Sequence, residues 1–210
     1  VITEGVVAVP ALVLSQTIAA FSDQKLTLSV TGSTLLVQGE RSKSTITTVD
    51  ISEFPTLPYV KEGEGVSAKL QSRDVTALLK MVSFAASTST MKPELASISC
   101  TLEGGDLIVA ATDSFRLAEA RASVRVRSSF GPILIPARNV PDITRSIETA
   151  QEVEVRVSEN QCTFLTDGGF ITSRTIDGSF PDYRALIPKE FVVTATALRE
   201  DVVRAFKKVS

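Results

Sequence analysis

The clearest structural signal in the chain is a stretch at residues 66–86, which reads VSAKLQSRDVTALLKMVSFAA. Its first five residues alternate apolar and polar side chains, and this alternation predicts a short strand over residues 66–70. The apolar residues that follow recur at helical spacing, at Val75, Leu78, Leu79 and Val82. We therefore expect a helix over residues 72–86, with Ser72 as its N-cap.

This strand-and-helix opening recurs near the C-terminus, because residues 200–210 resemble residues 73–83 at an offset of 127. Two further anchors return at an offset of 126, where Val9-Pro10-Ala11 matches Ile135-Pro136-Ala137 and Phe54-Pro55 matches Phe180-Pro181. Several anchors in one order indicate a repeated unit of roughly 125 residues. We therefore divide the chain into the second half of one unit (1–62), a complete unit (63–189) and the first strand and helix of a third (190–210). With these boundaries the chain resembles a fragment, because it begins in the middle of one unit and ends at the first helix of another. Its first and last pieces are therefore not expected to complete their own cores.

The complete unit has the pattern of an α+β domain. A hairpin is predicted across Gly104-Gly105, between strands at 95–103 and 107–111. Further strands are predicted at 117–126, 132–135, 153–157, 162–165 and 170–176. A second helix is predicted over residues 138–149, where Pro141 is tolerated only in the first turn. Two helices and about eight short strands indicate antiparallel sheets that the helices cover on one face.

Composition excludes most catalytic chemistry. The 210 residues include 22 Lys and Arg, 24 Asp and Glu and no histidine, for a net charge of −2. Without histidine there is no Ser–His–Asp triad, Cys–His pair or His-ligated zinc site, and we expect neither a cofactor nor a metal. No apolar run approaches the ~20 residues of a membrane span, and no signal-peptide pattern is present, so we expect no membrane partner. Two cysteines, Cys100 and Cys162, favour a reducing cytoplasmic setting.

Basic residues mark the outer faces of the predicted helices. Arg73 and Lys80 lie seven residues apart, each two residues from an apolar core position, so they point away from the core. Arg138 and Arg145 repeat this arrangement on the second helix, and the third carries Arg204, Lys207 and Lys208. Such faces suit sequence-independent contact with the phosphates of a polyanion. Ordinary solvated helix faces have the same pattern, and the sequence leaves both interpretations open.

Two motifs carry a family resemblance. They are ATDSFRLA at residues 111–118 and DGSFPDYR at residues 177–184. Together they resemble the bacterial sliding clamp, the β subunit of DNA polymerase III, in which the motifs appear as ATDGHRLA and DGxFPDY. The resemblance covers essentially the whole chain, and Ile135-Pro136 before a helix also fits it.

The resemblance implies a DNA clamp fold and a non-catalytic function. In that family, two chains of three similar domains form a head-to-tail homodimer ring around duplex DNA, with helices lining the hole. The ring tethers the replicative polymerase and so raises its effective concentration at the primer end. By this resemblance, the DNA-binding residues are Arg73, Lys80, Lys92, Arg138, Arg145, Arg204 and Lys207. We expect the present chain to be a monomer or a nonspecific oligomer that does not encircle DNA.

The family also implies a peptide-binding groove, which receives short motifs of Gln and apolar residues from the polymerase, the clamp loader and other DNA-processing enzymes. One wall would be formed by Thr112, Ser114, Phe115, Arg116 and Leu117. The apolar floor would be formed by Pro181, Leu186 and Ile187, and Leu95 falls at another matching position. The competing interpretation places Leu117, Leu186 and Ile187 in the core. In the family, the groove lies between the second and third domains.

The chain departs from the family pattern at three places. Ser114-Phe115 replaces Gly-His, which enlarges the apolar wall and removes a titratable group. Leu12 and Val13 stand where the family often has basic residues, so the DNA contact of the first domain is in doubt. Pro93-Glu94 stands beside Lys92 where the family sometimes has aromatic residues.

Two alternatives to a sliding clamp remain open. The first is a peptide-binding module from a truncated or divergent clamp without DNA encirclement. The second is an enzyme that uses Asp113, Asp167, Asp177 and Asp182 as metal-binding carboxylates. Asp113 and Asp167 lie in sequences typical of turns, and Asx-turn hydrogen bonds explain the presence of these two aspartates more simply.

Overall fold

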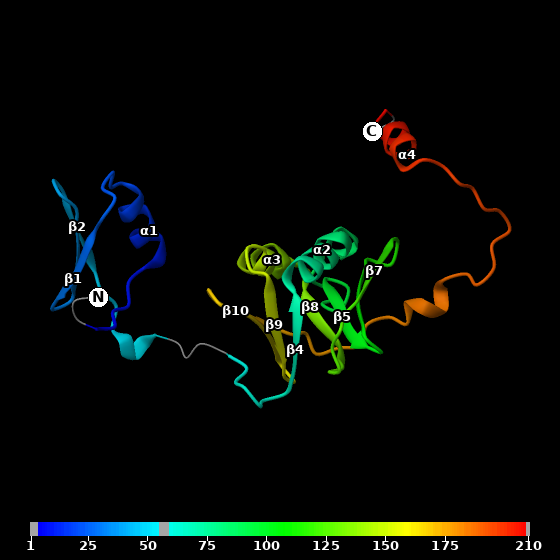
Figure 1. Cartoon of the computed structure of the whole chain (residues 1–210), viewed down its shortest axis with the longest axis horizontal. Helices are drawn as coiled ribbons and strands as arrows, with labels where there is room; N and C mark the ends of the chain where they lie inside the picture. Colours follow the sequence, from blue (N-terminus) through cyan, green and yellow to red (C-terminus); the bar gives the residue numbers. More distant parts are fainter. Residues whose placement is uncertain (1–3, 55–58, 209–210) are drawn as a thin grey trace. The chain divides into compact units, whose positions relative to one another are not determined.

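The chain divides into two compact units, Val1–Pro58 and Tyr59–Ser210. A computed structural model describes residues 4–54 and 59–208, and Figure 1 shows its elements. Pro55 of the first Phe-Pro anchor lies outside the described residues, as do Val209 and Ser210 at the end of the C-terminal repeat. The assignment of 1–62, 63–189 and 190–210 to successive repeats stays a prediction.

The first unit is a small helix-and-sheet layer. Helix α1 (Ala11–Ala19) follows Pro10, and the 3-10 helix η1 (Ile51–Glu53) closes the described part. Between them, β1 (Thr27–Thr31), β2 (Thr34–Gln38) and β3 (Lys43–Thr47) form an antiparallel sheet in the order β1-β2-β3. Among its described residues, Leu35, Val37 and Ile46 form a small core cluster with half-buried neighbours.

The second unit contains two four-stranded antiparallel sheets. One has the order β11-β10-β9-β4, from β4 (Val66–Gln71), β9 (Glu152–Val157), β10 (Gln161–Thr166) and β11 (Gly169–Arg174). The other has the order β7-β6-β5-β8, from β5 (Ser97–Glu103), β6 (Asp106–Thr112), β7 (Leu117–Ser123) and β8 (Phe130–Pro136). Gly104 and Gly105 join β5 to β6 with φ angles of 61° and 84°, as a two-residue hairpin turn requires. The predicted α+β class with eight strands is confirmed.

Two helical segments cover the sheets and contact each other (Figure 1). They are α2 (Ser72–Val82) with η2 (Ser83–Ala85), and η3 (Ala137–Asn139) with α3 (Val140–Ile147). Their apolar stripes join both sheets in one core, to which the predicted Val75, Leu78, Leu79 and Val82 all belong. Pro141 lies in the first turn of α3, as expected. Two exposed C-terminal elements follow, η4 (Tyr183–Leu186) and α4 (Arg199–Lys207), of which only Tyr183 is buried.

The predicted N-cap is wrong. Gln71 is the N-cap of α2, and Ser72 is its first residue, fully buried and with no hydrogen-bond partner for its hydroxyl group among the residues that the structure describes. The pairing of β4 with β9 sets this register, because Gln71 lies opposite Glu152 and the Ser72 N–H donates to the Gln151 carbonyl. The Ser72 side chain therefore points into the core, away from the backbone N–H groups from which an N-cap side chain accepts a hydrogen bond.

Replacing Ser72 by alanine is expected to stabilise the second unit by about 1 kcal/mol. The change removes a desolvated hydroxyl without a partner and introduces a better helix former. The free energy of unfolding in urea measures the effect. Ser83→Ala at the C-terminal end of α2 is the matched control, since the Ser83 hydroxyl donates to the Lys80 carbonyl and its loss is expected to be neutral or slightly destabilising. Equal effects of the two changes would contradict the assignment.

Candidate functional site

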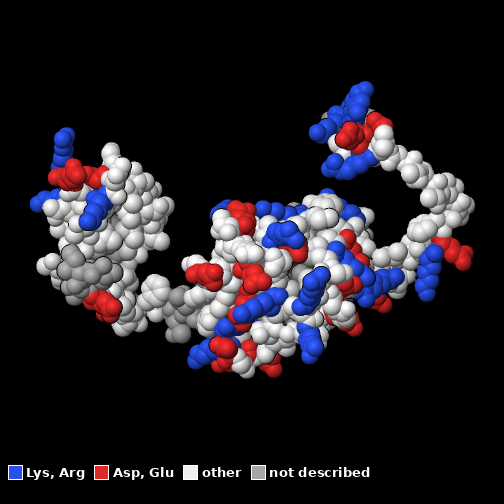
Figure 2. All heavy atoms as spheres, viewed as in Figure 1, with Lys and Arg blue, Asp and Glu red and all other residues white. Residues whose placement is uncertain are grey.

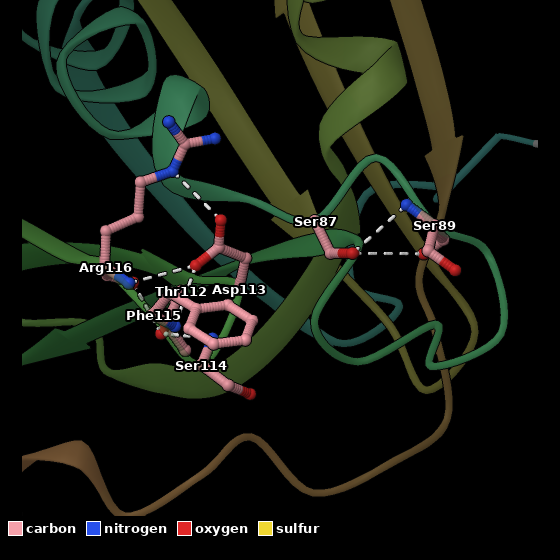
Figure 3. A network of polar contacts seen from close by, with 7 residues as sticks. All are labelled: Ser87, Ser89, Thr112, Asp113, Ser114, Phe115 and Arg116. Carbon is pink, nitrogen blue, oxygen red and sulfur yellow. Dashed lines mark hydrogen bonds and ion pairs between the residues drawn. The ribbon is translucent and has the colours of Figure 1, made fainter.

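The turn between β6 and β7 is organised by the carboxylate of Asp113 (Figure 3). Its Oδ1 accepts hydrogen bonds from the backbone N–H groups of Phe115 and Arg116, each at 3.0 Å. The Thr112 hydroxyl closes the same turn by donating to the Arg116 carbonyl at 2.7 Å. The bonds from Phe115 and then Arg116 hold the pKa of Asp113 below its ordinary value. The Asx turn predicted for Asp113 is confirmed, and it gives this carboxylate a structural role.

The side chains of Phe115 and Arg116 leave this turn in different directions (Figure 3). Ser114 has a φ of 79°, a conformation that a non-glycine residue adopts at a cost. The Phe115 ring that follows is 98% exposed. The Arg116 Nε donates to Asp113 Oδ2 at 3.0 Å, and its guanidinium lies 5.9 Å from the centre of the Phe84 ring. A cation and an exposed aromatic ring are thus held at one strand junction.

The turn forms one side of a groove of about 430 Å³, whose other side comes from a segment 64 to 76 positions further along the chain. Eight of the nine residues predicted to contact a peptide line it: Thr112, Ser114, Phe115, Arg116, Leu117, Pro181, Leu186 and Ile187. Leu117, Leu186 and Ile187 are 38%, 78% and 44% exposed, so the competing interpretation that they belong to the core is wrong. An open groove with apolar sides and a cationic end is suited to binding a short apolar peptide.

Leu95 does not line this groove. It is 7% exposed, in the loop before β5, where its N–H donates to the Lys92 carbonyl and its carbonyl accepts from the Ser87 N–H. These bonds fold the loop back on itself and bury the leucine side chain, which is a packing role that the motif match did not indicate.

The sequence analysis missed two lining residues, Tyr183 and Pro188. Tyr183 is buried, and its hydroxyl donates to Glu119 Oε2. Its place inside the DGSFPDYR motif was an available signal, since an aromatic residue among exposed neighbours requires a packing partner. Glu119 could have been suggested by strand alternation, because it follows Leu117 by two residues and so lies on the same face of β7.

The outward faces of α2 and α3 carry a mixed-charge surface. Arg73, Lys80, Arg138 and Arg145 are all exposed. Lys80 and Arg145 are brought together, since both line a shallow depression of about 320 Å³ between the helices. Lys80 Nζ lies 3.2 Å from Glu148 Oε2, Arg145 Nη1 lies 3.1 Å from Asp142 Oδ1, and Arg73 Nε lies 3.4 Å from Asp74 Oδ1. Figure 2 shows cationic and anionic side chains interspersed over the visible face of this unit.

These ion pairs reduce the positive electrostatic potential of the surface, but its cations remain able to bind a phosphate. Exposed pairs contribute only about 0–1 kcal/mol, so each cation can leave its carboxylate for a phosphate at small cost. Of the other predicted DNA-binding residues, Lys92 lies in the loop before β5, and Arg204 and Lys207 lie on α4, where Arg204 Nη2 is 3.6 Å from Asp201 Oδ1. Leu12 and Val13 are exposed on α1.

The acidic residues and cysteines in the described ranges form neither a metal-binding cluster nor an activated thiol. Among residues 4–54 and 59–208, no three His, Cys, Asp or Glu side chains are close enough to hold a metal ion. Cys100 and Cys162 are free and buried, and burial raises the pKa of Cys100 to about 12, so it is not an activated nucleophile. No helix in these same ranges is both long and apolar enough to cross a membrane.

The amino-acid sequence is similar to one family of known proteins. A family model described as "DNA polymerase III beta subunit, central domain" matches residues 69–182. The "Beta sliding clamp" of Synechocystis sp. is 28% identical over 229 residues, covering 98% of this chain and 58% of that protein. The "Beta sliding clamp" of Bacillus subtilis is 24% identical over 177 residues, covering 83% of this chain and 46% of that protein. The chain thus spans about half the length of the curated relatives it matches.

Solved structures show the same fold. The DNA polymerase III subunit beta of Pseudomonas aeruginosa matches with a TM-score of 0.79 and 26% identity, covering 87% of this chain and 50% of that one. A griselimycin-bound sliding clamp from the same organism matches with a TM-score of 0.86 and 24% identity, covering 95% of this chain and 55% of that one. The predicted clamp fold is confirmed.

Proposed function

This chain belongs to the family of the DNA polymerase III beta subunit, central domain, and from that premise we propose that it is part of a DNA sliding clamp. In this proposal the protein is a non-catalytic processivity factor, needs no cofactor, and acts in the cytoplasm where the chromosome is copied. Its relatives are named for the same role, "Beta sliding clamp".

The observation that carries the proposal is the convergence of two distant segments in one groove. The β6–β7 turn and the segment from Pro181 to Pro188 leave apolar side chains exposed there, beside Arg116. Exposed leucines and the exposed Phe115 ring beside a cation favour an occupant with apolar side chains and a carbonyl or carboxylate group. We assign this groove to short Gln-containing apolar motifs of a replicative polymerase, a clamp loader and other DNA-processing enzymes.

The helix face supports a second contact, with duplex DNA. Four exposed cations on η3, α2 and α3 lie among three carboxylates, so the surface has only a small positive excess. A weak contact with phosphates favours no base pair and allows the protein to move along the duplex. In the full-length protein we place this face toward the hole of a homodimeric ring.

A titration of a fluorescent Gln-x-x-Leu-Phe peptide tests the groove. We expect saturable binding by this chain and an affinity about tenfold lower for Arg116→Ala, because a charge-assisted hydrogen bond to the peptide is lost. Arg174→Ala is the matched control, since Arg174 is exposed at the end of β11 in the other sheet. Equal losses in both variants, or no binding by the unaltered chain, would argue against the assigned groove.

A further inference from the structure

The segment that carries the apolar side of the groove is attached at a single buried point. From residue 174 to residue 208, Tyr183 is the only residue that is buried. Its ring packs edge-to-face against half-buried Phe180, with centroids 6.0 Å apart. Leu186 and Ile187, which follow within four residues, are exposed and cannot hold themselves in place. The position of this side of the groove therefore depends on what holds Tyr183.

Tyr183 is held by Glu119 of β7. The tyrosine hydroxyl donates to Glu119 Oε2, and the carboxylate is compensated by Arg121 Nη2 at 3.4 Å and Arg184 Nε at 4.0 Å. Burial, and then the bond to Glu119, raise the pKa of Tyr183, so the hydroxyl keeps its proton throughout the neutral range. The hydrogen bond joins residues 64 positions apart.

The same strand therefore supports both sides of the groove. Leu117 belongs to the side formed by the β6–β7 turn, and Glu119 projects from the same face of β7 two residues later. Through Tyr183, Glu119 ties the opposite side, with Leu186 and Ile187, to that strand. The distance across the groove is then set by the spacing between Leu117 and Glu119 on β7.

We propose that the Glu119–Tyr183 hydrogen bond is a latch that fixes the width of the peptide groove, and that Glu119 is a positioning residue for peptide binding. This inference rests on the proposed function of the groove. Glu119 itself does not line the groove, so its effect on a bound peptide passes through Tyr183. A loosened latch leaves Leu186 and Ile187 to be ordered when the peptide binds, which lowers its affinity.

Four variants test the latch with the fluorescent Gln-x-x-Leu-Phe peptide. Tyr183→Phe removes the donor and keeps the ring, Glu119→Met removes the acceptor at similar length, and Glu119→Gln keeps an acceptor oxygen. We expect about fivefold weaker binding for the Phe and Met variants, since one hydrogen bond is lost, and near-normal binding for the Gln variant. The double variant Tyr183→Phe/Glu119→Met should bind no more weakly than either single variant, because both remove the same bond. Glu159→Met, in the exposed β9–β10 turn, is the control and should bind normally.

Hydrogen exchange at the amides of residues 184–187 separates the latch from the function of the groove. We expect faster exchange in the Phe and Met variants, unchanged exchange in the Gln variant and an unchanged thermal unfolding midpoint in all four. If the unaltered chain binds no peptide, the proposed function fails, and the exchange rates alone decide whether the latch holds the segment. Normal exchange in Tyr183→Phe, or normal peptide affinity of that variant beside a binding wild type, would overturn the latch.

Discussion

Asp113→Ala is expected to weaken binding of the fluorescent Gln-x-x-Leu-Phe peptide by more than the roughly tenfold loss expected for Arg116→Ala, which removes a single bond to the peptide. The alanine removes the acceptor for the N–H groups of Phe115 and Arg116 and for the Arg116 side chain. Ser114 has a φ of 79°, and without these hydrogen bonds fewer contacts hold it in that conformation. The turn relaxes, and Phe115 and Arg116 leave the positions in which they form the groove. The fluorescence anisotropy of the labelled peptide measures this loss of affinity.

Asp113→Asn is the matched variant, because its amide oxygen can still accept both backbone N–H groups. It should retain most of the affinity, and an asparagine variant as weak as the alanine variant would show that charge, rather than turn geometry, matters. The pKa of Asp113 is lowered, so the ionised carboxylate supports the turn at every pH above the ordinary carboxyl range. Affinity should therefore be flat from about pH 5 to pH 8 and should fall only as the pH drops through the lowered pKa. The asparagine variant should lack that fall.

Arg156→Met is expected to lower the free energy of unfolding of the second unit by about 3 kcal/mol. The Arg156 side chain is 9% exposed, with Nε 2.8 Å from Glu154 Oε1. Its Nη1 donates to the Tyr59 hydroxyl at 3.0 Å and to the Val60 carbonyl at 3.3 Å. Methionine fills the space but leaves a half-buried carboxylate and a buried carbonyl without their donor. Urea unfolding measures the loss.

A second substitution shows whether the loss comes from the unpaired carboxylate. Arg156→Met/Glu154→Gln should recover part of the stability, because it removes the uncompensated charge. Arg174→Met, on β11 of the same sheet but exposed, should change stability by less than about 0.5 kcal/mol. The bond from Arg156 is the main cause of the lowered pKa of Glu154, so the unaltered chain should lose this contribution only as the pH falls through that lowered pKa. A loss below about 1 kcal/mol in Arg156→Met would contradict the assigned anchoring role.

Short-range patterns were sufficient for most of the secondary structure. Apolar spacing located α2, and the Gly104-Gly105 pair located the β5–β6 hairpin, because both signals depend on neighbours within one turn of helix or one strand pair. The two motifs at 111–118 and 177–184 identified both segments of the groove, since each is contiguous in the chain. Ends of elements were less predictable, as at β7, which stops at Ser123 rather than at residue 126.

Long-range packing decided the rest. The burial of Ser72 follows from the register of β4 with β9, and the burial of Leu95 from a loop that closes on itself. The pairing of Lys80 with Glu148 joins residues 68 positions apart, and that of Arg156 with Tyr59 joins residues 97 apart. Periodicity shows which face of an element is apolar, but the polar partners of that element depend on which other elements pack beside it. For that reason the sequence alone was enough to recognise the clamp fold and the motifs of its groove, whereas the support of that groove by Glu119 and Tyr183 required the tertiary structure.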